Sequence, residues 1–311
     1  MRNISGLTAI ECKYCYNKWR VEMVNGQPVF ISEIREHQQP RISDLFHQEN
    51  AYATAGVPVE IHEVDYENYC QYEPYEGVTR DFSDSVYTAL SKGNAVVTAG
   101  GYCNYAPAIV GGIQRAVGED KDIGIIWIDA HPDCRIAETS PDPMRLVSVP
   151  MSTITGLTLE NYRKTVCGLN IPCKGENIIA SDIRILDESS AANLCKAQVI
   201  KLDASIFANE AAWSAAVQDL AARVDVIYLS VDADILKFKY IPSYEKEVPY
   251  GHDVDVVARN VRIAMETNKV CALSLFCFDF DHYERNGHIT CASAMEILEA
   301  GLKNWKQVPL N

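Results

Sequence analysis

The chain has 311 residues, of which 48% are hydrophobic and 23% charged, so it is long enough to bury a sizeable core as ordinary globular proteins do. Its formal net charge of −14 argues against nucleic acid or an anionic membrane as a partner, and no apolar stretch approaches the roughly 20 residues of a membrane span. The first residues lack the apolar segment of a signal peptide and the 11 cysteines are scattered, which together predict a cytoplasmic protein with reduced thiols.

The N-terminal part of the sequence predicts short strands and one helix. Residues 27–32 have the pattern of a short strand, and residues 41–46 that of a helix start. Residues 57–64 alternate apolar and polar side chains, which favours a strand near the edge of a sheet. The segment 66–78 is rich in Tyr and Glu and indicates a loop, and 82–92 indicates a helix that stops at the following glycine.

A strand, a glycine turn, a helix and a second strand come next. Residues 94–99 form a buried strand that runs into Gly100 and Gly101, and residues 108–117 show a helical pattern. The run 123–128 is apolar and mostly β-branched, which is typical of a strand buried on both faces of a parallel sheet. We therefore expect one βαβ unit whose strands pair in parallel.

The rest of the chain alternates strands and helices without an evident linker, so we expect a single α/β domain over residues 1–311 with a mostly parallel sheet. Strands are expected at 177–181, 224–231 and 270–278, with a further alternating segment at 194–202. Helices are expected at 159–166, 210–223, 253–267 with Asp253 as its N-cap, and 290–305.

Metal-capable side chains follow two of these strands. Asp129, His131 and Asp133 come directly after 123–128, spaced by two, so all three point to one side if the chain stays extended there. Asp232 and Asp234 come after 224–231. Open α/β sheets bind ligands at the carboxyl ends of their strands. Clustered carboxylates raise one another's pKa values, and divalent cations remove that penalty. Oxygen ligands with one imidazole point to Mn²⁺ before Zn²⁺, and two ions about 3.5–4 Å apart can activate a bridging water as hydroxide.

Three motifs in this order give the chain a resemblance to the ureohydrolase superfamily of arginases, agmatinases and formimidoylglutamases. Members carry Gly-Gly-Asp-His-Ser, then Asp-Ala-His-x-Asp, then Asp-x-Asp. Here Gly-Gly-Tyr-Cys-Asn stands at 100–104, Asp-Ala-His-Pro-Asp at 129–133 and Ser-Val-Asp-Ala-Asp at 230–234. The resemblance covers roughly residues 94–302 and implies a three-layer α/β/α sandwich. It also implies self-assembly into a homo-oligomer.

The resemblance further implies two Mn²⁺ ions per chain and metal-bound hydroxide that attacks a guanidino or amidine carbon. Carried over residue by residue, the implied ligands are Asp129 and Asp232 bridging both ions, Asp133 and Cys103 completing one, and His131 and Asp234 completing the other.

Several positions depart from the family pattern. Cys103 stands where the family usually has His, and a thiolate is a softer ligand than Mn²⁺ prefers. Val147 occupies the place of the proton-shuttling His of arginases. His252 and His288, on later loops, are candidates to replace it, and we name His252 as the catalytic candidate.

The substrate-binding positions depart as well. Cys277 aligns with the family's guanidinium-binding Glu. Asp279 and Asp281 share its strand parity, so Asp279 is the proposed substitute in binding and catalysis. Arg135 takes the place of an Asn that helps arginases hold the free amino acid, and it is the second substrate-binding candidate.

These observations favour a divergent binuclear-metal hydrolase that cleaves a linear C–N bond of a small-molecule or peptide guanidino substrate. A peptidyl or modified arginine fits a pocket that has lost the free-arginine residues. The competing hypothesis is an arginase-fold pseudoenzyme, a binding or scaffold protein with an impaired metal site. A phosphatase-like two-metal enzyme is a weaker third reading, because the chain lacks the additional His ligands such a site needs.

Overall fold

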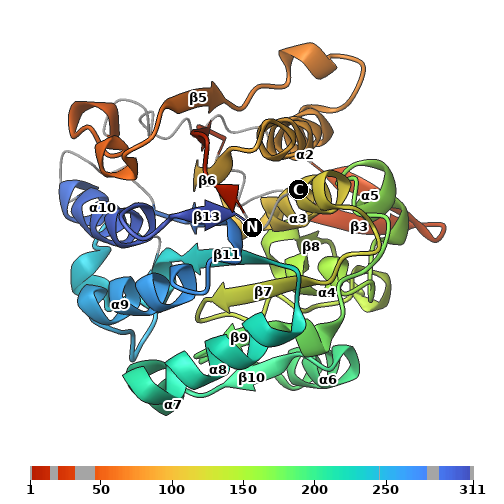
Figure 1. The fold of residues 1–311 in the computed structure, drawn as a ribbon. Coiled ribbons are helices and arrows are strands. Elements are labelled where there is room, and N and C mark those ends of the chain that lie inside the picture. The colour runs from red at the N-terminus through yellow and green to blue at the C-terminus, as the bar shows by residue number, and fades with distance from the viewer. Residues whose placement is uncertain (1, 15–19, 32–45, 245, 279–286, 309–311) are drawn as a thin grey trace.

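A computed structural model describes residues 2–14, 20–31, 46–244, 246–278 and 287–308. Its centre is an eight-stranded sheet with the order β10-β9-β7-β11-β12-β6-β2-β5, in which every pairing is parallel (Figure 1). The bounds of the strands, in that order, are Ile200–Leu202, Ile178–Ser181, Ile123–Ile128, Val226–Asp232, Val270–Phe276, Ala95–Gly100, Leu7–Cys12 and Val59–Glu63. The six strands from β9 to β2 are buried along their whole length, which explains why they are almost uniformly apolar.

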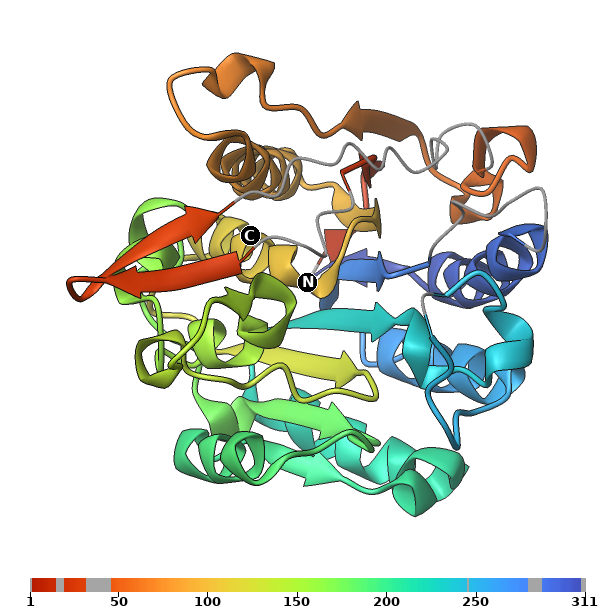
Figure 2. The same ribbon diagram turned by 180° about the vertical axis from the view of Figure 1, so that it is seen from behind.

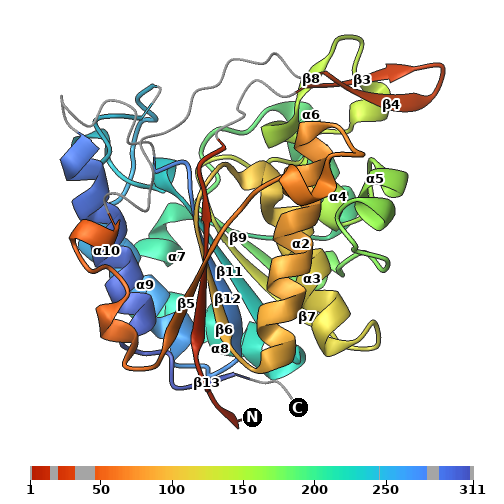
Figure 3. The same cartoon turned by 90° about the horizontal axis from the view of Figure 1, so that it is seen from above.

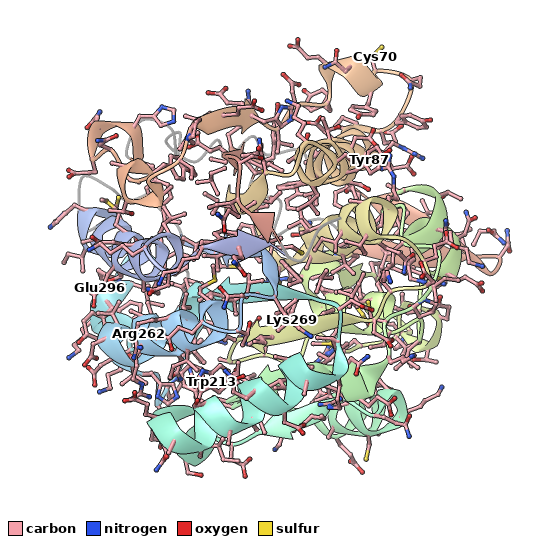
Figure 4. The ribbon with its side chains drawn as sticks, in the orientation of Figure 1. Cys70, Tyr87, Trp213, Arg262, Lys269 and Glu296 are labelled. Carbon is pink, nitrogen blue, oxygen red and sulfur yellow. The ribbon has the colours of Figure 1, made fainter. Side chains whose placement is uncertain are left out.

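Helices cover both faces of this sheet and make the three layers that the resemblance predicted (Figure 3). One face carries α2 (Pro74–Lys92), α3 (Ala106–Val117), α4 (Pro150–Ile154), α5 (Glu160–Thr165) and α6 (Glu188–Ala197). The other carries α7 (Ala204–Ala208), α8 (Glu210–Arg223), α9 (Val254–Met265) and α10 (His288–Leu302). Trp213 of α8 is fully buried, and its Nε1 donates to the carbonyl oxygen of Asn260 in α9 at 3.1 Å (Figure 4).

Two small sheets lie outside the central one. Strand β1 (Arg2–Asn3) pairs with β13 (Gln307–Val308), which brings the two ends of the described chain together. Strand β3 (Arg20–Val24) pairs with β4 (Gln27–Ile31) and with β8 (Met144–Arg145), and the β3–β4 hairpin projects from the side of the molecule (Figure 2). Of the helices in the described ranges, not one is long and apolar enough to cross a membrane.

The structure corrects the predicted start of the first long helix. The loop prediction for 66–78 is wrong in its second half, because α2 begins at Pro74. Proline is favoured in the first helical turn, and Tyr75, Val78 and Phe82 then lie buried on one side of the helix. The helical pattern was missed because tyrosine was counted as a polar loop residue, whereas Tyr75 is buried in the core despite its hydroxyl. The predicted end at Lys92 is confirmed, with Gly93 in the left-handed conformation at φ 84°.

Other predicted elements also need correction. Strands β6 and β7 are parallel, but they are not neighbours, because β11 and β12 lie between them. The alternating segment 194–202 is the end of α6 followed by β10, with Gln198 in a left-handed conformation at φ 63° between them. Asp253 is the N-cap residue of α9 as predicted, but its side chain makes no capping hydrogen bond; it pairs instead with Lys237, Lys239 and Tyr240. The predicted helix start at 41–46 falls, except for Phe46, outside the described residues.

Candidate metal centre

The strand order gathers the predicted ligands at one edge of the sheet. Strands β7, β11, β12 and β6 are consecutive neighbours, and parallel strands end on the same side. Asp129 follows β7, Asp232 ends β11, Cys277 follows β12, and Cys103 comes just after the glycine turn at the end of β6. Residues up to 174 positions apart in sequence, Cys103 and Cys277, thus meet at one place.

Asp129, His131 and Asp234 form the first cluster, in which one possible ligand atom of each lies within 4.8 Å of the others. His131 Nδ1 lies 2.7 Å from Asp234 Oδ2 and 3.7 Å from Asp129 Oδ1. Backbone donors fix both carboxylates, because the amide of Ala130 donates to Asp234 at 3.0 Å and that of His131 donates to Asp129 at 2.6 Å. The hydroxyl of Tyr244 donates to Asp234 Oδ2 at 3.2 Å.

Cys103, Asp232 and Cys277 form the second cluster, again with one ligand atom of each within 4.8 Å of the others. Asp232 Oδ1 accepts a hydrogen bond from the amide of Asp234 at 3.0 Å, so the Asp-x-Asp spacing orients one carboxylate with the backbone of the next. Asp232 therefore belongs to one cluster and is bonded to a member of the other, which suits the bridging position that the resemblance implied.

Asp133 completes the set by a turn of the chain. Its φ of 45° ends the extended run after β7, so the three side chains are not brought together by simple alternation as predicted. Asp133 lines the same cavity as both clusters. Its Oδ2 is buried and has no hydrogen-bond partner among the described residues. A buried carboxylate oxygen without a donor costs free energy, and a cation is the partner that removes the cost.

The electrostatics of the cluster fit a divalent cation. Burial raises the pKa of both Asp129 and Asp232 well above the usual range, and the charge of Asp234 raises them further. Burial likewise raises the pKa of Asp133 to about 7. Burial alone would lower the pKa of His131, but its bonds to Asp129 and Asp234 outweigh that effect and raise it. Carboxylates that resist ionisation when alone become good ligands once a cation neutralises them.

Both clusters open into one cavity of about 270 Å³. It is lined by the residues of both clusters, by Asp133, and by Tyr102, Arg145, Val147, Ser148, Ile185, Tyr244, Lys246, Glu247, Val248 and Pro249. Tyr244, Lys246 and Glu247 were not predicted as site residues. They lie in a loop that has neither a periodic pattern nor a motif, so the sequence does not indicate which way their side chains face. Val147, predicted at the position of the proton shuttle, does line the cavity.

An arginine behind the site ties three strand ends together. The backbone amide of Arg184 donates to the carbonyl of Ala130 at 2.9 Å, and its Nη2 donates to the carbonyl of Asp234 at 2.7 Å. Its Nη1 lies 2.5 Å from Asp182 Oδ2, and the same oxygen lies 2.7 Å from His252 Nε2. These largely buried side chains hold the backbone of both metal-binding motifs in place.

The other predicted site residues lie away from the cavity or outside the described ranges. His252 is not among the described residues that line the cavity; its ring pairs with Asp182 and packs on Phe207, with centroids 4.7 Å apart. Arg135 is exposed and pairs with Asp187 at 2.7 Å. His288 is exposed and lies at a different surface depression, beside Cys291 and Met295. Asp279 and Asp281 lie outside the described residues.

Comparison with known proteins decides the relationship that this geometry suggests. A sequence model of the Arginase family matches residues 32–300. The chain belongs to the Arginase family. Arginase of Emericella nidulans is 35% identical over 88 residues, which cover 28% of this chain and 27% of that protein. Arginase of Entamoeba histolytica is 23% identical over 226 residues, covering 65% of this chain and 75% of that protein.

Solved structures of relatives share the fold of this arginase-family chain along nearly its whole length. The structure of Entamoeba histolytica arginase in complex with L-ornithine matches with a TM-score of 0.77 and 16% identity, covering 96% of this chain and 98% of that one. The structure of formimidoylglutamase from Bacillus subtilis matches with a TM-score of 0.73 and 16% identity, covering 97% and 88%. The match in sequence to the Emericella nidulans arginase, by contrast, spans only about a quarter of that protein's length, 27%.

The raised carboxylate pKa values of the arginase-family site predict how the metal-free protein responds to pH. A carboxylate whose pKa is higher in the folded than in the unfolded state stabilises the fold at low pH, and the contribution is lost as pH rises through the folded value. For Asp133 that window runs from the model-peptide value of about 3.9 up to about 7. We therefore expect the melting temperature of chelated protein to fall between pH 5 and 7.5, measured by scanning fluorimetry.

Divalent metal should reverse this loss. At a free concentration near 100 times its dissociation constant, the metal adds about 3 kcal/mol to the free energy of unfolding, which raises the melting temperature by roughly 4–5 °C for 311 residues. Asp133→Asn, which keeps the shape but cannot ionise, should make the pH dependence of the chelated protein less steep, and the rest of the slope should come from Asp129 and Asp232. A melting temperature that rises over the same pH range, or that metal leaves unchanged, would contradict the assignment.

Proposed function

We propose that the protein is a hydrolase that cleaves a linear C–N bond of a guanidino-type substrate at a two-metal centre. The observation that carries this proposal is the meeting of four carboxylates and one imidazole, from the ends of neighbouring strands, around one small cavity. Membership of the Arginase family supports the hydrolytic chemistry.

In this proposal each cluster would hold one metal ion. The ligands are those that the resemblance implies: His131 and Asp234 would hold one ion, Asp133 and Cys103 the other, and Asp129 and Asp232 would serve both. The oxygen and imidazole ligands of the first cluster favour Mn²⁺. When bound, divalent ions supply Lewis acidity and lower the pKa of water to near neutrality. Self-assembly into a homo-oligomer stays a prediction.

The chain's own residues then bind and orient the substrate. Glu247 lines the cavity and offers a carboxylate for a guanidinium, a role predicted for Asp279. Arg145 and Lys246 line it too and suit a carboxylate at the other end of the substrate. Tyr244 keeps Asp234 oriented through its hydroxyl. We assign His252 a positioning role, because its imidazole holds Asp182 and, through Arg184, the backbone of Asp234.

The size of the cavity limits the substrate. About 270 Å³ is below the range of pockets that enclose drug-sized ligands, so it admits one guanidino side chain or a small guanidino compound. A peptide would therefore insert an arginine side chain and leave its backbone outside. This fits both the small-molecule and the peptidyl form of the hypothesis.

The test, in the presence of Mn²⁺, is release of urea from arginine, agmatine and arginyl peptides, and release of N-hydroxyurea from N-hydroxyarginine. We expect turnover of at least one of them, abolished by a chelator and restored by metal. If none of these compounds is turned over, the proposal in this form is contradicted. Binding of the same compounds without turnover, measured by calorimetry, would instead favour the pseudoenzyme.

A further inference from the structure

Two cysteines face one carboxylate in the second cluster. Cys103, Asp232 and Cys277 are 4%, 3% and 3% exposed, and one possible ligand atom of each lies within 4.8 Å of the other two. All three line the cavity, so a species bound among them is reachable by a small substrate. The first cluster contains only carboxylates and an imidazole, so the two halves of the centre differ sharply in ligand softness.

The backbone is arranged so that Cys277 faces the cavity. Its φ of 61° is a left-handed conformation, which residues other than glycine rarely adopt. The amide of Cys277 donates to the carbonyl of Gly101 at 2.9 Å, which fixes the end of β12 against the turn after β6. Gly101 itself is left-handed at φ 72° and leads into Cys103, the first residue of a short 3₁₀ helix (Cys103–Tyr105).

Two thiolates and one carboxylate are a suitable set for a thiophilic cation. Catalytic zinc sites use three protein ligands and leave the fourth tetrahedral position open, with sulfur about 2.3 Å from the metal. Two thiolates on one tetrahedral ion then lie about 3.8 Å apart, a separation that the observed limit of 4.8 Å accommodates. The open position would face the cavity that all three residues line.

We propose that Cys103, Asp232 and Cys277 bind a thiophilic divalent cation of the zinc class, so that the centre holds two chemically different metals. Cys277 is a metal ligand in this arrangement, although it aligns with a substrate-binding position of the family. The inference deepens the proposed function and rests on it for the presence of the second ion, but it assigns that ion to Cys103, Asp232 and Cys277 in place of the set with Asp133 and Asp129 that the resemblance implies. The other ion, at Asp129, His131 and Asp234, keeps oxygen and imidazole ligands and the preference for Mn²⁺.

Cobalt reports this ligand set directly. We would titrate metal-free, full-length protein under reducing conditions with Co²⁺ and record the absorption spectrum. A thiolate-to-cobalt charge-transfer band should appear in the near ultraviolet, and Zn²⁺ should remove it at stoichiometric amounts whereas Mn²⁺ should not. Tight binding of Co²⁺ without the band would overturn the proposal, and so would a disulfide between Cys103 and Cys277 in protein isolated under reducing conditions.

Variants separate the two thiols from other cysteines. Cys277→Ser and Cys103→Ser should each weaken or abolish the band and lower Zn²⁺ affinity by at least about 100-fold, since even loss of an outer-shell partner costs 10–100-fold. Cys134→Ser is the matched control, because Cys134 is fully buried beside Asp133 but belongs to neither cluster. A band that survives Cys277→Ser unchanged would exclude Cys277 as a ligand.

X-ray absorption at the zinc edge needs no variant and stays decisive if a serine variant fails to fold. The unaltered protein loaded with Zn²⁺ should show sulfur neighbours at about 2.3 Å, and only nitrogen and oxygen neighbours would overturn the proposal. The urea assay is independent of these spectra. Sulfur ligation without turnover would support this inference and contradict the proposed function. Turnover with Mn²⁺ but no sulfur ligation would support the proposed function and contradict this inference.

Discussion

Asp232→Asn should abolish hydrolysis, with kcat/KM reduced by about 10³-fold or more and with loss of metal from both clusters. Asp232 is the carboxylate that lies in the sulfur-bearing cluster and accepts from the backbone of Asp234 in the other. An amide of the same size keeps the packing but supplies neither the charge nor the strong ligand. Lewis-acid stabilisation is worth several kcal/mol, and each 1.36 kcal/mol is tenfold in rate.

The measurement combines urea release with metal content of the dialysed protein. Asp187→Asn is the control, since Asp187 is an exposed carboxylate paired with Arg135, and asparagine also serves well in its N-capping position before α6. The control should keep both activity and metal. Full activity of Asp232→Asn would show that this carboxylate is not part of the centre, and the ligand assignment would then fail.

Arg184→Met should lower the free energy of unfolding by about 3–5 kcal/mol, as expected when one partner of a buried ion pair is removed. The side chains of Arg184 and Asp182 are only 9% and 4% exposed, and the guanidinium also donates to the carbonyls of Asp234 and Pro249. Methionine fills most of the space, so the loss reports the missing charge and hydrogen bonds. Metal affinity should fall as well, because Arg184 holds the backbone that carries Asp234.

Denaturant unfolding of the metal-free protein measures the first effect, and metal titration the second. Arg135→Met is the matched control, because Arg135 also pairs with an aspartate, Asp187, at an N–O distance of 2.7 Å. This pair is exposed, with side-chain exposures of 51% and 42%. Exposed pairs contribute about 0–1 kcal/mol, so this variant should be nearly neutral. Equal destabilisation by the two substitutions would contradict the role given to Arg184.

Much of the site was predictable because its ligands are attached to the clearest pattern in the chain. Buried parallel strands are nearly uniform apolar runs, so a carboxylate directly after one is conspicuous, as Asp129 and Asp232 are. Since all such strands end on the same edge, the two motifs could be expected to meet. The regular alternation of strands and helices predicted an α/β domain with a mostly parallel sheet, and the family resemblance implied its three layers.

The remaining features depend on contacts between distant segments, for which a single sequence carries little signal. The insertion of β11 and β12 between β6 and β7 places Cys277 next to Cys103, and no local pattern specifies that order. In the sequence Arg184 looks like an ordinary surface arginine, yet contacts with three strand ends leave its side chain only 9% exposed. The left-handed turn at Asp133 likewise replaces the alternation that the motif suggested, because local propensity does not determine a site built by tertiary packing.

Anomalous diffraction from crystals grown with both Mn²⁺ and Zn²⁺, recorded at the absorption edge of each metal, tests the two-metal centre most directly. We expect two peaks, one on either side of Asp232: manganese beside Asp129, His131 and Asp234, and zinc beside Cys103 and Cys277. If neither cluster shows a peak, or if metal binds only at sites remote from Asp232, the two-metal centre is contradicted.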